Sequence, residues 1–302
     1  SFILWGPDAL KSLDGTFAIA LYDSQENHLF LARDRLGVKP LYYSFLSDGT
    51  FIFASEIKAL FRYPGLKAEM DIRALDNLFS FGFQLCPGTF FRHIEQLLPG
   101  HYVLVTPEKI RQFSYWDLDP KRAPLKGGMP EMKEAFMEHL QSAVTKRLVS
   151  DVPVGAYLSG GIDSSAVSML YAGLKPEGVS TFSIGFPHPD YNEERYSTFM
   201  AQTLKTRHTY FMCDPQSGDF EKMIRTLEEP MLTLLHLPLF YLSKTVHQAG
   251  FKVVLSGDGA DELLGGYDYF RLLKIFQFVR KHPGMNPVSL YQRVFSRLET
   301  RS

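Results

Sequence analysis

The chain has 302 residues, of which 45% are hydrophobic and 22% charged, and its formal net charge at pH 7 is -1. This is the composition of a soluble globular protein with enough chain for about two domains. The near-zero charge favours neither nucleic acid nor a membrane surface as partner, and no apolar run approaches the roughly 20 residues of a membrane-spanning helix. Two cysteines, Cys86 and Cys213, are too few for a disulfide scaffold and fit a reducing compartment.

The first third of the chain is predicted to be rich in β-strand, because short apolar segments alternate with polar turns. The SDGT turn at 47–50 is typical of a hairpin, since Asp-Gly tolerates positive φ. A short helix is expected at 56–61. The predicted strands lie at 17–23, 28–34, 41–46, 51–55, 100–107 and 111–118.

Residues 119–130 are rich in proline, glycine and lysine and are predicted to form a linker. An amphipathic helix is expected at 131–149, and strands and helices alternate after it. This order predicts a parallel sheet covered by helices, with ligands at the carboxyl ends of its strands. Strands are expected at 152–159, 179–186, 208–213 and 251–257, and helices at 164–174, 192–204, 220–229, 237–249 and 269–282.

The stretch YLSGGIDSSAVSML, at 157–170, joins a predicted strand to a predicted helix. Its glycines allow a sharp turn, and a helix that starts near Ser164 adds N–H groups and a positive dipole end, which suits phosphate. Ser159 and Ser165 add hydroxyl donors. The lysine of a GxxxxGK[ST] phosphate loop is absent, and Asp163 stands inside the stretch instead. That carboxylate indicates a divalent metal between it and the phosphates, whereas a glycine turn with Asp163 as helix N-cap needs no ligand.

The stretch VLSGDGADELLGGY, at 254–267, also follows an apolar predicted strand. Asp258, Asp261 and Glu262 place three carboxylates in one short loop, and they repel one another unless a cation or a basic partner compensates. A solvated acidic turn explains the same cluster without a ligand. Because both acidic loops follow strands of one predicted sheet, we favour a shared magnesium ion held by Asp163 and Asp261.

A third predicted strand ends in TFSIGF, at 181–186. Ile184 and Gly185 stand where apolar strand-end residues often line an adenine pocket beside a phosphate loop. Simple core packing explains these two residues equally well.

In this order, SGGIDSS, STFSIGF and VLSGDGADELLGGY resemble the motifs of the glutamine-hydrolysing asparagine synthetases, and SGGIDSS is similar to the pyrophosphate loop of the adenylating ATP pyrophosphatases, the PP-loop enzymes. LDGTFAIALYD, LARDRLGVKPLYY, FASEIKAL and SYWDL resemble the later part of the family's glutaminase domain. The resemblance implies an α/β protein with a truncated N-terminal-nucleophile-type αββα glutaminase domain (its C-terminal half) at 1–118 and a linker at 119–130. A doubly wound, parallel-sheet PP-loop ATP pyrophosphatase domain, truncated at its C-terminal end, would occupy 131–302.

The resemblance also implies a mechanism. ATP and aspartate form β-aspartyl-AMP and pyrophosphate with Mg²⁺, and ammonia from glutamine then converts the adenylate to asparagine. Asp163 and Asp261 would bind magnesium, and Asp258 would act near the intermediate. The implied enzyme is cytoplasmic, acts on small molecules (aspartate, glutamine or ammonia, ATP) without nucleic acid or membrane, and is compatible with a homodimer. The nucleotide and its pyrophosphate would be bound by Leu158, Ser159, Gly160, Gly161, Asp163, Ser164, Ser165, Ile184, Ser256 and Gly257.

The chain also departs from the family pattern. The glutaminase cysteine and the residues that bind glutamine would all precede the first motif present here, so this chain by itself is expected to be inactive. Ser1 stands in a context that matches an internal family segment, which argues against an N-terminal nucleophile. The segment 228–244 lacks the substrate-contacting pattern of the best-known asparagine synthetases, which leaves the acid substrate open.

Two alternatives follow from these departures. The first is adenylation of another carboxylate, as in a β-lactam synthetase, a peptide cyclase or an amidotransferase of surface-polysaccharide clusters. The second is a non-catalytic remnant that binds a partner, and the two intact acidic loops argue against it.

Overall fold

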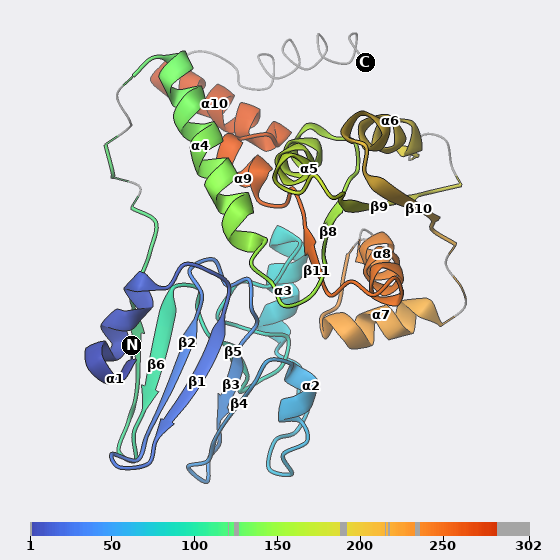
Figure 1. Cartoon of the computed structure of the whole chain (residues 1–302). Coiled ribbons are helices and arrows are strands. Elements are labelled where there is room, and N and C mark those ends of the chain that lie inside the picture. The colour runs from blue at the N-terminus through green and yellow to red at the C-terminus, as the bar shows by residue number, and fades with distance from the viewer. Residues whose placement is uncertain are drawn as a thin grey trace. The chain divides into compact units, whose positions relative to one another are not determined.

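The computed structural model describes residues 2–119, 121–123, 127–187, 192–214, 216, 218–232 and 236–282. The chain falls into two compact units, whose elements are labelled in Figure 1. One contains Ser1–Lys133 and Asp214–Tyr241, and the other contains Glu134–Cys213 and Leu242–Ser302. The segment Asp214–Tyr241 thus counts with the first unit although it lies inside the predicted second domain, and the domain boundaries stay a prediction.

Two antiparallel sheets form the core of the first unit. Their strands are β1 (Ala18–Asp23), β2 (His28–Arg33), β3 (Tyr42–Phe45), β4 (Phe51–Ala54), β5 (Glu95–Gln96), β6 (His101–Val105) and β7 (Ile110–Ser114). The larger sheet has the order β1-β2-β6-β7 and the smaller one the order β4-β3-β5. Each predicted strand of this region is therefore present, and β5 is an addition that the sequence pattern did not indicate.

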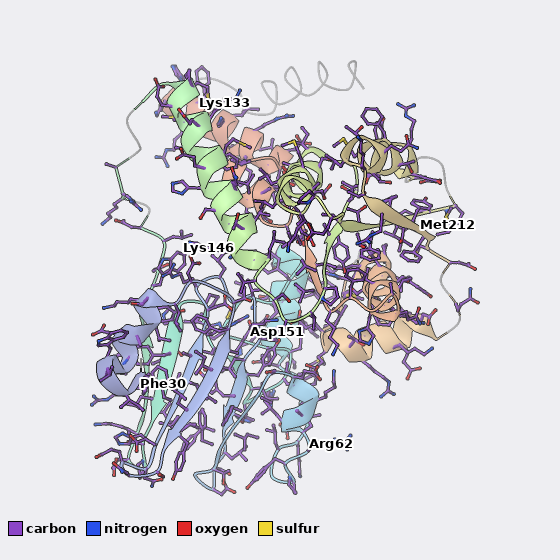
Figure 2. All side chains as sticks on the ribbon, viewed as in Figure 1. Phe30, Arg62, Lys133, Lys146, Asp151 and Met212 are labelled. Carbon is purple, nitrogen blue, oxygen red and sulfur yellow. The ribbon has the colours of Figure 1, made fainter. Side chains whose placement is uncertain are left out.

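The side chains of β2 alternate between the two faces of the larger sheet. Leu31 packs between the sheets with Tyr43 of β3, whereas Phe30 (labelled in Figure 2) and Ala32 pack on the outer face with Leu10. That outer face is covered by α1 (Phe2–Trp5) and the 3-10 helix η1 (Gly6–Ser12), and the outer face of the smaller sheet by α2 (Ile57–Leu60). The layers follow the predicted order of helix, sheet, sheet and helix.

Two longer helices complete the first unit. Helix α3 (Ile72–Phe81) was not anticipated from the sequence, although it starts at an N-cap, Asp71, that accepts a hydrogen bond from the Arg73 N–H, and ends at the left-handed Gly82. Helix α7 (Asp219–Leu227) comes from the Asp214–Tyr241 segment and fully buries Met223.

The second unit is built on a parallel sheet. Its strands are β8 (Val154–Tyr157), β9 (Ser180–Gly185), β10 (Arg207–Met212) and β11 (Val253–Leu255). They lie in the order β10-β9-β8-β11, and each neighbouring pair is parallel. In chain order this is 3-2-1-4, so the direction of winding reverses between β8 and β11. Such a switch point is where parallel sheets bind ligands, in the crevice beyond the carboxyl ends of the strands.

Helices cover both faces of this sheet, which confirms the predicted fold. Val144 of α4 and Tyr171 of α5 pack on one face, and Leu242 and Val246 of α8 pack on the other with Phe182. Helix α4 begins inside the predicted linker. The helices are α4 (Met129–Arg147), α5 (Ile162–Leu174), α6 (Glu194–Leu204), α8 (His236–Gln248), α9 (Ala260–Leu264) and α10 (Asp268–Lys281). Across the described ranges, no helix combines the length and apolar character needed to cross a membrane.

A chain of buried and half-buried polar side chains links β9 and β10 to the residue that precedes the glycine loop. The Nδ1 atom of His208 lies 2.9 Å from Oγ1 of Thr181, and its Nε2 atom lies 3.3 Å from Oγ of Ser183. The Ser183 hydroxyl donates in turn to the carbonyl of Leu158. Burial lowers the pKa of His208, so the folded chain holds this imidazole neutral.

This lowered pKa makes stability depend on pH. The unfolded chain takes up the His208 proton at a higher pH than the folded chain does, so the stabilisation is complete above the ordinary pKa of about 6.5 and is lost as the pH falls below it. Urea unfolding of the wild-type chain and of His208→Gln, at about pH 7.5 and about pH 5.5, should show a steeper loss in the wild type, by at most about 1.4 kcal/mol per pH unit. All other titrating groups are shared, so equal slopes in the two chains would contradict the assignment.

Candidate functional site at the switch point of the parallel sheet

The first predicted loop leaves β8 and folds back on the start of α5. Leu158 is fully buried, and its N–H donates to the carbonyl of Phe182 at 2.9 Å. The hydroxyl oxygens of Ser159 and Ser164 lie 2.9 Å apart, and the Gly161 N–H donates to the Ser159 hydroxyl at 3.2 Å. These bonds tie the loop to the first helical turn.

The start of α5 presents backbone donors rather than a side-chain cap. Gly161 occupies the N-cap position and makes no side-chain cap hydrogen bond. Asp163 lies within the first turn, so it is not the N-cap that the ligand-free interpretation required. The N–H groups and positive dipole end of this 13-residue helix remain suited to an anion, as predicted. Ser165 also adds a buried hydroxyl without a partner among the described residues.

Gly160 is fixed by a neighbour that the sequence did not reveal. Its φ is +90°, and a Cβ atom there would lie 2.5 Å from the backbone carbonyl carbon of Tyr196 and 2.6 Å from the backbone nitrogen of Ser197. Both residues belong to α6, so only glycine lets the loop pass this helix. The segment around Tyr196 was predicted to be a helix, and no signal in it indicated contact with the loop.

The second acidic loop touches the first one at Gly257. A Cβ atom at this position would lie 2.8 Å from the backbone nitrogen of Ser164 and 3.0 Å from both the carbonyl carbon and Cβ of Asp163. The backbone after β11 is therefore packed directly on the first turn of α5. This contact brings the two predicted loops together at the switch point, next to the side chain of Asp163.

The three carboxylates of the second loop lie in different surroundings. Asp258 is exposed and Asp261 is half-buried in the first turn of α9. The Asp261 carboxylate lies over Gly266, where a Cβ atom would come within 1.8 Å of its Oδ1 atom. Glu262 accepts a hydrogen bond of 2.8 Å from the Tyr267 hydroxyl. That bond, with the nearby charges of Glu262 and Asp261, raises the pKa of Tyr267 to about 12.

The donor set allows a magnesium site only with help from a ligand. Within the part of the chain that the structure describes, no group of three or more His, Cys, Asp or Glu side chains is placed to hold a metal. Magnesium, however, is commonly held by one or two carboxylates together with substrate phosphates and water. Asp163 and Asp261 on loops in contact fit this arrangement, and their metal role stays a prediction.

Ile184 and Ser256 stand at strand ends beside these loops. Ile184 is half-buried at the carboxyl end of β9 and packs with Tyr157 and Val254 against the Phe182 cluster, so core packing accounts for much of its surface. Ser256 is half-buried and directly precedes Gly257. Contact of either residue with a nucleotide stays a prediction.

Comparison with known proteins identifies the family of the chain. The sequence model of asparagine synthase matches residues 135–299, which is more than half of the chain, and that of the glutamine amidotransferase domain matches residues 1–116. The chain belongs to the asparagine synthase family. At family level it is thus related to ATP-dependent, glutamine-hydrolysing amidotransferases.

Curated relatives carry more than one name. Asparagine synthetase [glutamine-hydrolyzing] 3 of Bacillus subtilis is 32% identical over 89% of this chain and 46% of its own length. A putative asparagine synthetase of Methanocaldococcus jannaschii is 33% identical over 92% of the chain and 54% of its own length, and amidase chyE of Penicillium rubens is 32% identical over 88% and 42%. The chain spans about half of the length of these relatives. Among solved structures, an NH3-dependent NAD synthetase of Campylobacter jejuni covers 47% of this chain and 62% of its own at 22% identity, with a TM-score of 0.31, too low to support an argument.

The close approach at Gly257 predicts the effect of a single methyl group. Gly257→Ala places Cβ against backbone atoms of α5 that cannot move alone, so we expect a loss of about 1–3 kcal/mol in the free energy of unfolding and weaker binding of magnesium pyrophosphate, measured by urea unfolding and by calorimetric titration with magnesium present. Gly173→Ala, in the same helix with nothing within 4 Å of the added Cβ, is the matched control and should be neutral or stabilising by up to about 1 kcal/mol. Equal stability of the two variants would contradict the contact.

Proposed function

We propose that the protein that contains this chain is a glutamine-hydrolysing, ATP-dependent ligase that makes asparagine from aspartate through β-aspartyl-AMP. The observation that carries the proposal is the contact of Gly257 with the first turn of α5. It joins a loop rich in N–H and hydroxyl donors to a loop rich in carboxylates, at the switch point of a parallel sheet. A cytoplasmic location and a homodimer belong to the same proposal.

The first loop would bind the pyrophosphate part of ATP. Backbone N–H groups at the start of α5 and the hydroxyls of Ser159, Ser164 and Ser165 would donate to its oxygens. Magnesium, held by Asp163 and Asp261, would neutralise phosphate charge when bound. Fixing the leaving pyrophosphate in this way leaves the α-phosphorus open to attack.

The reaction then needs two displacements. A carboxylate oxygen of aspartate bonds to the α-phosphorus as the bond from that phosphorus to the pyrophosphate oxygen breaks. Ammonia next bonds to the activated carbonyl carbon, and AMP leaves with the electron pair of the broken bond. The exposed Asp258 would orient the amine or accept a proton from it.

A second candidate is the same chemistry on another acid. It is supported by the match to a fungal amidase at 32% identity, a level similar to that of the asparagine synthetases. It is also supported by segment 228–244, which lacks the substrate-contacting pattern of the best-known asparagine synthetases. The loops described above would serve either acid, because they would hold ATP rather than the carboxylate.

A pyrophosphate-release assay on the full-length protein tests the proposal. With ATP, magnesium and glutamine present, release should depend on aspartate, and Asp163→Asn and Asp261→Asn should each lower it by about 10²–10³-fold, since each removes charge stabilisation of the leaving group. Asp268→Asn, which removes an exposed carboxylate from α10, is the control and should change release by less than about twofold. Release that needs a different acid would favour the second candidate, and full activity of Asp163→Asn would exclude the site.

A further inference from the structure

One segment of the chain joins the two matched families. Asp214–Tyr241 lies within the residues matched by the asparagine synthase model, yet its contacts place it in the first unit, with the residues matched by the glutamine amidotransferase domain. The segment contains α7 and the first part of α8. The synthase-family sequence therefore contributes directly to the structure of the amidotransferase-family part.

Glu228 fastens this segment to the first unit. Its Oε2 atom accepts a hydrogen bond from the N–H of Ile57, and its Oε1 atom accepts one from the N–H of Lys58, both at 2.7 Å. The Lys58 ammonium lies 3.6 Å from Oε1, and the Glu228 side chain is only 10% exposed. A carboxylate 170 residues away in sequence thus caps the start of α2.

Two local features show that this contact is specific. Glu56, the residue at the N-cap position of α2, makes no side-chain cap hydrogen bond, so the helix depends on Glu228 for its first N–H groups. Glu228 itself has a φ of +62°, where the backbone of any residue other than glycine is strained. The backbone after α7 therefore adopts an unfavourable conformation while its carboxylate makes two charge-assisted bonds.

The residues after Glu228 extend the contact. A cavity of about 360 Å³ within the first unit is lined by Leu78 of α3 and by Glu229, Met231 and His236. Its apolar surroundings raise the pKa of Glu229, an effect that His236 opposes. The segment thus contacts α2 through Glu228 and shares the lining of this cavity with Leu78 of α3.

Helix α8 continues the chain from this segment into the residues of the second unit. It runs without a break from His236 to Gln248, and the boundary between the two units falls inside it, after Tyr241. Leu237 at its start is buried with the first unit, and Leu242 and Val246 belong to the core under the parallel sheet. A helix is a stiff element, so a displacement at one of its ends can be transmitted to the other.

We propose that Glu228 is a positioning residue that couples glutamine use in the amidotransferase part to amide formation in the synthase part. The inference rests on the proposed function. Glu228 touches none of the residues expected to bind ATP, and acts by holding the Asp214–Tyr241 segment in place on α2.

The test compares two variants of the full-length protein that remove the same charge beside the same lysine. Glu228→Gln replaces the carboxylate that caps α2, whereas Glu56→Gln removes the partner whose Oε2 lies 2.9 Å from the Lys58 ammonium but caps no N–H group. Amide product is measured with glutamine and, separately, with ammonium chloride as nitrogen donor. Hydrogen exchange is measured at the N–H groups of Ile57 and Lys58.

Glu228→Gln should lower glutamine-dependent synthesis about tenfold, change ammonium-dependent synthesis by less than about twofold, and speed exchange at Ile57 and Lys58. Glu56→Gln should leave the ratio of the two activities unchanged. An equal loss of both activities in Glu228→Gln would contradict the coupling and leave Glu228 as a structural cap of α2. Unchanged hydrogen exchange at Ile57 and Lys58 would contradict the capping contact itself. A wild-type protein without synthesis from either nitrogen source would overturn the proposed function instead, and the two failures are thereby distinguished.

Discussion

The candidate site depends on an approach so close that only a residue without a side chain permits it. Gly257 sits against the first turn of α5, with room for no Cβ between it and Ser164 or Asp163. The strand order explains why these two loops meet, because β8 and β11 are neighbours while the loops that follow them lie about 90 residues apart in sequence. Gly160 makes a similar approach on the side of α6, so the donor loop is confined between two backbones.

How much of this arrangement the sequence predicted depends on how far apart in the sequence the interacting residues lie. The strands of both units, and the placement of the two loops at strand ends, follow from local alternation and from the order of elements. The approach of Tyr196 to Gly160 and the capping of α2 by Glu228 depend on residues brought together by the fold. Such contacts leave no periodic pattern. Helix α3 is a different case, since its cap residues Asp71 and Gly82 were visible in the sequence and were overlooked.

Segment Asp214–Tyr241 shows why domain limits are hard to predict from sequence. Helix α7 is amphipathic, and this pattern says that one face is buried but not against which partner. Met223 is fully buried with the first unit, although the flanking strands β10 and β11 belong to the parallel sheet of the second. The chain thus leaves the first unit and returns to it, and the capping bonds of Glu228 hold the returning segment on α2.

The charges of the two loops set a condition on any phosphate that binds there. Residues 159–165 and 256–262 contain four carboxylates and neither lysine nor arginine. Against a polyphosphate, the dipole of α5 offers only about half a positive charge, which the carboxylates outweigh. Pyrophosphate and this site therefore repel each other at short range unless a cation is shared between them. A site with this composition gains selectivity from that requirement, because it would bind the metal complex of the nucleotide and reject the free anion.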